Sequence, residues 1–406
     1  MPNALFRYPM LYLLLTAAAG AVLRGMAFLP AWQSRYEPLL HAHSHIALLG
    51  WGYSALILLL AALFLSREDL RSRLFRTIWL LTQCTIVLMF LAFLLQGYGF
   101  YSILFSTIHI LLSYVQVVWM WRKFKKTTCY PIAIRFAKAS LLFMVLSSAG
   151  PWCLAVLSAK HLSESPWYHA SLYFYLHGQY NGWFTLGLFA VLYALLEQKQ
   201  IILSRRLTSF HYWGYTLSLL PSFLLSLLWM NLSPFWITIA VISGLLQLAS
   251  VLAFFIMWIR SRAFISTLFT DGSAKVLLHL ALMALAVKMV LETTSAIPAL
   301  EALVFSTRSI VIGYLHLVLL GFVSCAMLAI AFHLQWLNVR ARLKILGCVL
   351  FIAGFMTNEL ILFLDGLFNW MYASSFPFVS ISLLAASLLM LMGIAILGWK
   401  TSFNKP

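Results

Sequence analysis

Twelve apolar runs divide this chain almost from end to end, and they decide what it can fold into. A helix of about 20 apolar residues spans the hydrocarbon core of a bilayer, with every backbone polar group satisfied within it. We therefore predict an all-α polytopic membrane protein with twelve transmembrane helices in one transmembrane domain over residues 1–406. The runs are 9–29, 41–65, 76–97, 100–122, 136–158, 168–195, 209–231, 234–259, 275–298, 309–334, 344–367 and 377–399.

The composition supports a chain that lies almost wholly within lipid. Hydrophobic residues make up 63% of it and charged residues 9%, whereas soluble domains carry about 25% charged residues. The five cysteines are scattered and form no C-x-x-C motif. This spacing argues against a disulfide framework, a zinc ribbon and covalent c-type haem attachment.

The net charge of +17 is distributed unevenly between the two sides of the predicted bundle. Twenty-two Lys and Arg residues fall at both chain ends and in alternate connections, around residues 67–76, 122–138, 199–206, 260–275 and 340–344. The opposite connections hold only Arg35, Lys160 and Arg308. The positive-inside rule then predicts cytoplasmic termini in a bacterial-type inner membrane. Anionic lipid headgroups balance this charge, so nucleic acid is not an expected partner.

A short pattern occurs three times: His, four residues, Gly, then an aromatic residue. The copies begin at His45, His177 and His316, on the second, sixth and tenth predicted helices. Their spacing of four helices predicts three pseudo-symmetric four-helix arcs, approximately 1–130, 131–262 and 263–406. Internal repeats of this kind often place binding sites where the repeated units meet.

Neutral imidazole ligates Fe, Cu or Zn, so these histidines are candidate ligands. His41 lies one α-helical turn before His45 on the same face, whereas His43 points the other way. His109 is a further candidate metal ligand. A haem held between helices also needs small residues beside it, and Gly52 and Gly313 lie close to two of the motif histidines.

A purely structural interpretation stays open for each histidine, since membrane helices use buried His for interhelical hydrogen bonds. His177 could bond to its neighbours Gln179, Tyr180 or Asn181. His41 could simply be solvated at the membrane surface.

The predicted arrangement resembles subunit I of the haem–copper oxidase and nitric oxide reductase superfamily, and is similar to the reduced NnrS-type haem membrane proteins. The resemblance covers the whole chain in topology but only the three His-centred stretches in motif. It implies haem b, with copper or another metal as a second cofactor, and oxidoreductase activity toward oxygen or nitric oxide. Electrons would come from a donor protein or from quinol, and partner subunits are also implied.

Carried over by position, the resemblance makes His45 and His316 haem ligands and His177 a copper ligand. Tyr180 matches a tyrosine beside the copper, and Arg308 could pair with a haem propionate. Two departures leave the binuclear ligand set incomplete. The seventh helix has no His-His pair, and the tenth has a single His in its outer part.

Three charged residues within the apolar runs are candidates for proton transfer, apart from the histidines. Lys288 and Glu292 are one helical turn apart, so we expect mutual neutralisation, with a proton relay as the functional alternative. Glu359 follows Asn358 and has no evident local partner, which makes it a candidate proton-transfer group. These three residues suit a proton-coupled secondary transporter as the alternative function. A third possible function is that of a haem-free relative of the oxidase fold that serves as an assembly or partner subunit.

Overall fold

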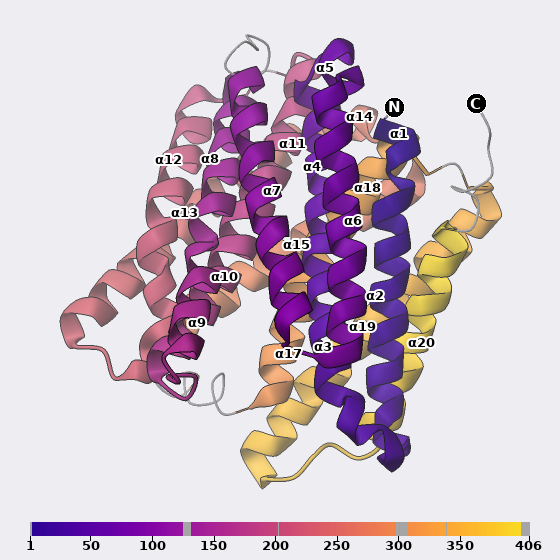
Figure 1. The fold of residues 1–406 in the computed structure, drawn as a ribbon. Coiled ribbons are helices and arrows are strands. Elements are labelled where there is room, and N and C mark those ends of the chain that lie inside the picture. The colour runs from indigo at the N-terminus through magenta and orange to yellow at the C-terminus, as the bar shows by residue number, and fades with distance from the viewer. Residues whose placement is uncertain are drawn as a thin grey trace. The chain divides into compact units, whose positions relative to one another are not determined.

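The computed structural model describes residues 2–124, 131–201, 203–297, 300, 307–337 and 339–398. Every regular element in these ranges is a helix, as Figure 1 shows, and no strand occurs among them. The prediction of an all-α protein is therefore confirmed. The predicted run ends at residues 298 and 399 lie outside the described residues, as do four basic residues of the charge pattern: Lys125, Lys126, Lys400 and Lys405.

Eleven helices of the described part are long and apolar enough to cross a membrane. Each overlaps one of the twelve predicted runs, which confirms an integral membrane protein with many spanning helices. The remaining run, 168–195, is also helical, from residue 166 to residue 198, but is not one of the eleven. Its centre carries His177, Gln179 and Asn181, which lower its hydropathy. A twelfth span therefore stays a prediction.

The chain divides into two compact units, and unit 1 comprises Met1–Met120, Asp271–His279 and Ser324–Pro406. Within it, α2 packs against α20 and η3, α3 packs against α6, and α19 packs along α20. The helices of this unit are α1 (Pro2–Leu5), α2 (Arg7–Gly25), η1 (Met26–Phe28), η2 (Pro30–Arg35), α3 (Tyr36–His45), η3 (Ile46–Tyr53), α4 (Ser54–Phe64), α5 (Arg67–Arg71), α6 (Arg73–Gln96), most of α7 (Phe100–Phe124), the start of α15 (Gly272–Thr294), α18 (Cys325–His333), α19 (Ala341–Tyr372) and α20 (Val379–Gly398).

Unit 2 comprises Trp121–Thr270 and Leu280–Val323. Within it, α8 packs against η4 and α11, and α12 packs along α13. Besides the rest of α15, its helices are α8 (Pro131–Ser147), α9 (Ala149–Ala159), α10 (Pro166–His177), η4 (Gly178–Phe184), α11 (Thr185–Gln198), α12 (Arg205–Ser222), η5 (Phe223–Met230), α13 (Pro234–Arg260), α14 (Arg262–Leu268), α17 (Arg308–His316) and most of η6 (Leu317–Ser324).

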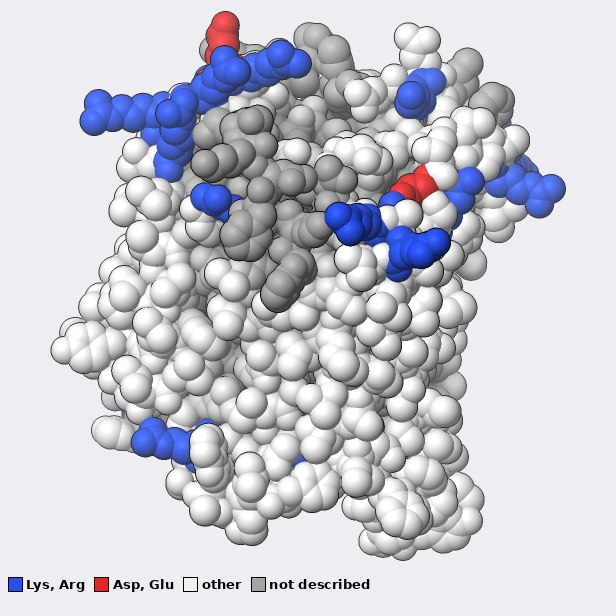
Figure 2. All heavy atoms as spheres, turned by 90° about the vertical axis from the view of Figure 1, so that its right-hand side faces the viewer, with Lys and Arg blue, Asp and Glu red and all other residues white. Residues whose placement is uncertain are grey.

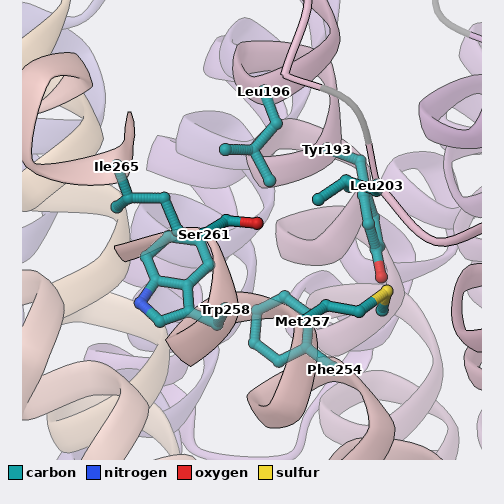
Figure 3. Close-up of a pocket in the computed structure, with 8 residues that line it drawn as sticks. All are labelled: Tyr193, Leu196, Leu203, Phe254, Met257, Trp258, Ser261 and Ile265. Atoms are coloured by element: carbon teal, nitrogen blue, oxygen red, sulfur yellow. The ribbon is translucent and has the colours of Figure 1, made fainter. Parts of the chain in front are cut away.

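A small pocket in unit 2 lies among side chains of α11, α13 and α14, with Leu203 beside them (Figure 3). Tyr193, Phe254 and Trp258 form much of its wall. Its volume of about 10 Å³ is room for roughly one water molecule. It is a packing gap and is too small for a cofactor.

The molecular surface agrees with a membrane setting. On the face drawn in Figure 2, the blue Lys and Arg side chains lie mostly toward the top of the view, and a few lie toward the bottom. The broad band between these two zones is almost entirely white on that face, so it shows hardly any charged side chain. Charge is excluded from hydrocarbon and tolerated at headgroup level, so this band is where lipid contact is expected.

Each of the three motif histidines is followed at once by a π-helical segment. His45 precedes η3, His177 precedes η4 and His316 precedes η6. A π-helix bonds the N–H of residue i+5 to the carbonyl of residue i, so the His-to-Gly spacing of the motif equals one π turn. Such segments are rare and occur frequently at functional sites. The repeated sequence pattern therefore corresponds to a repeated backbone irregularity.

The motif glycines have a packing role in the first two copies. A Cβ on Gly50 would lie 3.0 Å from the Tyr12 side chain of α2. A Cβ on Gly182 would lie 2.5 Å from Cβ of Phe143 in α8. In both units, then, a side chain at this position would require its neighbours to shift, including a side chain of α2 in the first copy and of α8 in the second.

Candidate functional site

Unit 1 contains three candidate ligand histidines, His41, His45 and His109, which we call the imidazole group. The His45 ring stacks on Phe93 with ring centroids 4.1 Å apart and planes 28° apart. The His41 ring meets the edge of Tyr98 at 4.5 Å. Two of the predicted metal residues thus share an aromatic setting next to the start of η3.

One hydrogen bond determines the tautomer of His45. Its Nδ1 lies 2.8 Å from the backbone carbonyl of His41, and a carbonyl only accepts, so Nδ1 carries the proton. The opposite nitrogen, Nε2, then has a free lone pair and no hydrogen-bond partner among the described residues. A neutral imidazole held by a carbonyl on one nitrogen is the usual form of a histidine ligand.

His109, on α7, is 2% exposed, yet neither ring nitrogen has a hydrogen-bond partner among the described residues. Its ring meets Tyr53 edge-on, with centroids 5.0 Å apart. Burying an imidazole without partners is unfavourable, so this residue calls for an explanation.

His43 turns away from the other two histidines of its helix, as predicted from helical geometry. Its Nδ1 lies 3.0 Å from the carbonyl of Thr16 in α2. Its Cε1 would lie 3.1 Å from a Cβ on Gly20 of that helix. His43 therefore ties α3 to α2, which is a structural role.

Unit 2 contains a second group, Lys288, Glu292, Asn181 and His177, which we call the buried relay. Lys288 is fully buried, and its Nζ lies 2.5 Å from Oε2 of Glu292. The other carboxylate oxygen accepts from Nδ2 of Asn181 at 2.7 Å. The predicted neutralisation of Lys288 by Glu292 is confirmed, and Asn181 extends the pair to the second motif histidine.

Both ring nitrogens of His177 take part in this network. Nε2 donates to the backbone carbonyl of Leu219 at 2.8 Å, so Nδ1 is the acceptor for Asn181 at 3.0 Å. The alternative in which His177 bonds to Asn181 is therefore confirmed. Neither nitrogen is available to a metal in this arrangement, and the predicted copper role would require one of these bonds to break.

The Glu292 carboxylate lies within electrostatic range of three tyrosines, Tyr180, Tyr215 and Tyr314. Tyr215 donates to the backbone carbonyl of Asn181 at 3.1 Å. The rings of Tyr180 and Tyr314 meet edge to face at 6.1 Å. Sequence reasoning identified Tyr180 but missed Tyr215 and Tyr314, for which the aromatic content of their helices was the only signal.

The helix that carries His177 presents polar residues every four positions, at Asn181, Thr185, Tyr193 and Glu197. Tyr193 bonds Nδ1 of His211 at 2.8 Å. Glu197 accepts from two backbone N–H groups at the start of α8, at 3.1 and 3.2 Å. At position 189 a phenylalanine interrupts this series. The series is therefore not continuous, and Glu197 at its end is only half-buried.

The expectation that Glu359 has no local partner is wrong. Nδ2 of the adjacent Asn358 donates to Oε1 of Glu359 at 3.0 Å, within α19 of unit 1. The amide and carboxylate both lie on one helix, so the pair forms without help from another element. This hydrogen bond is enough to explain the presence of Glu359 by a structural role. Its proton-transfer role stays a prediction.

The other predicted cofactor residues are divided between the units. Gly52 is buried within η3 of unit 1. Arg308, Gly313 and His316 belong to α17 of unit 2. The prediction that His45 and His316 hold one haem is untested, because the two residues lie in different units.

In the ranges that the structure describes, no three His, Cys, Asp or Glu side chains come together as a metal site. A comparison with protein-family models finds no match, and a comparison with curated proteins finds none either. The function is therefore inferred from the two groups described above.

Proposed function

We propose that this chain is a haem-binding integral membrane protein in which His45 would hold the iron. The observation that carries the proposal is the His45 ring, which has its proton fixed on Nδ1 by the His41 carbonyl. The Nε2 atom of His45 has no hydrogen-bond partner among the described residues, which supports a ligand at this position.

The chemistry that haem supplies is one-electron transfer or the handling of oxygen or nitric oxide. The protein's own residues bind and orient it: His45 offers Nε2, the His41 carbonyl keeps Nδ1 protonated, and Phe93 stacks on the imidazole. The resemblance to oxidase subunit I supports this assignment, with an external electron donor or quinol.

We further propose twelve spans in three arcs, with both termini cytoplasmic in an inner membrane. The positive-inside bias supports this orientation, and the π-helical segments after His45, His177 and His316 support the repeat. Arg308 and Gly313 stay candidate cofactor neighbours of His316, and Gly52 a candidate neighbour of His45.

The test is the haem content of purified variants. His45→Ala should lose the haem bound by the wild-type protein, because Nε2 of His45 is its proposed ligand. His279→Ala is the matched control, since His279 makes the same Nδ1 bond to the carbonyl four residues earlier, 2.7 Å, but is exposed. Wild-type protein purified without haem, or His45→Ala with full haem content, would contradict the proposal.

A second candidate function, proton-coupled transport, is favoured by the buried relay. Lys288 and Glu292 are buried, directly paired and connected through Asn181 to His177. Buried ionisable residues in membrane helices mark proton and substrate pathways by default.

Proton flux into dye-loaded vesicles separates this function from haem binding. The double variant Lys288→Met, Glu292→Gln removes both charges without leaving either unpaired, so we expect it to fold. If the relay moves protons, this variant should lose the flux of the wild-type protein and keep its haem. Equal flux in the two proteins would exclude the relay from proton movement.

A further inference from the structure

A surface hollow of unit 2 lies beside the first turns of α12. Its volume is about 600 Å³, it is open to the surroundings, and it is lined by Arg205, Arg206, Ser209, Phe210 and Trp213. Sites for small molecules typically measure about 300–1,000 Å³. The hollow is therefore large enough for a polar headgroup, and its lining combines two cations with two aromatic rings.

The positive charge of this hollow is not neutralised by the described part of the protein. Arg205 and Arg206 are exposed, and neither guanidinium has a hydrogen-bond or ion-pair partner among the described residues. The first turn of α12 contains no acidic residue. The acidic residue nearest in sequence is Glu197, whose two carboxylate oxygens accept from backbone N–H groups of α8. An anion in the hollow would therefore meet two uncompensated charges.

An exposed apolar strip continues from the hollow along the same helix. It consists of Phe210, Trp213, Leu217 and Leu220, which are 44–64% exposed. Their intervals of three and four residues place them on one face of α12. At a rise of 1.5 Å per residue the strip is about 15 Å long, or half of the roughly 30 Å hydrocarbon core. The strip thus matches the depth of one lipid leaflet.

We propose that the hollow binds one anionic phospholipid, with its phosphate at Arg205 and Arg206 and one acyl chain along the strip. A guanidinium offers several N–H donors in a plane, which suits the oxygens of a phosphate. A soluble anion would use the arginines but leave the strip uncovered, so the combination selects a lipid. The headgroup cation of a zwitterionic lipid would face two arginines, so the site should prefer a lipid with net negative charge. This proposal is independent of haem binding.

Two general trends could place these residues here without a specific site. Basic residues collect on the cytoplasmic side of membrane proteins, and Trp is enriched at the membrane interface. Neither trend requires one lipid to be retained in preference to another. Selective binding is therefore the property to measure.

The experiment is native mass spectrometry of the full-length protein in detergent, titrated with phosphatidylglycerol or with phosphatidylcholine of the same acyl chains. We expect the wild-type protein to bind one phosphatidylglycerol more tightly than phosphatidylcholine. The double variant Arg205→Gln, Arg206→Gln should weaken this binding by about 30-fold, since each basic residue near an anionic lipid contributes about fivefold. The control double variant Arg340→Gln, Arg342→Gln removes two exposed arginines from another connection and should leave the affinity unchanged.

Two additional measurements test the apolar part of the site. Trp213→Ala should weaken the binding of both lipids, because it interrupts the strip. Inorganic phosphate should not displace phosphatidylglycerol, because it has no acyl chain. Equal affinity of the wild-type protein for the two lipids would overturn the proposal. So would an equal loss of phosphatidylglycerol affinity in the two arginine double variants, since total charge rather than this hollow would then determine binding.

Discussion

Lys288→Met is expected to destabilise the folded protein by about 3–5 kcal/mol, because it leaves the buried Glu292 carboxylate without its counter-charge. Lys288 is fully buried, and the side chain of Glu292 is only 9% exposed. Among the described residues, the carboxylate would keep one hydrogen bond, from Nδ2 of Asn181 at 2.7 Å. Denaturant titration in detergent, followed by tryptophan fluorescence, measures the loss.

Two further variants test whether the unpaired Glu292 carboxylate causes the loss of stability in Lys288→Met. Lys275→Met, near the start of the same helix, removes a positive charge that is not fully buried and should change the free energy of unfolding by less than about 1 kcal/mol. Adding Glu292→Gln to Lys288→Met should recover most of the lost stability, because no unpaired charge then remains. A double variant no more stable than Lys288→Met alone would show that the pair is not what stabilises this region.

Gly182→Ala should destabilise the protein by about 1–3 kcal/mol through overpacking. The new Cβ would lie 2.5 Å from Cβ of Phe143 and 2.8 Å from its Cγ, and neither atom is the movable end of a flexible chain. Gly50→Ala should destabilise the protein less than Gly182→Ala does, because the closest contact of the new Cβ, at 2.8 Å, is the terminal Cδ1 of Ile46. The same unfolding measurement in detergent should rank the variants in this order.

Gly272→Ala is the control for this series. No atom lies within 4 Å of the position of its Cβ, so the substitution introduces no clash. It should leave stability unchanged or raise it by about 0.4–1 kcal/mol, as alanine restricts the unfolded chain. Equal stability of Gly182→Ala and Gly272→Ala would mean that the contact between η4 and α8 is looser than described.

Features that depend on neighbours along one helix could be predicted from sequence. The apolar runs located the helices because lipid imposes their length and composition. The contact between Lys288 and Glu292, and the opposite directions of His43 and His45, follow from the 3.6-residue repeat alone. In these cases the sequence interval decides which side chains can meet.

Features that depend on which helices meet could not be predicted in this way. Tyr53 and His109 are brought together by the packing of η3 against α7, and Tyr215 and Asn181 by the packing of α12 against η4. The π-helical geometry was also missed, although the five-residue interval from His to Gly in each motif matches one π turn. The error on Glu359 had a different origin, since the contact with Asn358 depends on a rotamer choice within one turn.

The central claim is that imidazoles of this membrane protein bind haem iron, and the reduced-minus-oxidised absorption spectrum of the purified wild-type chain tests it most directly. The account predicts a Soret band and the sharp visible bands of a low-spin haem, in a stoichiometric amount. A spectrum with no Soret band, from folded protein produced in cells supplied with haem, would contradict it. The buried relay of Lys288, Glu292, Asn181 and His177 would then be the better guide to function.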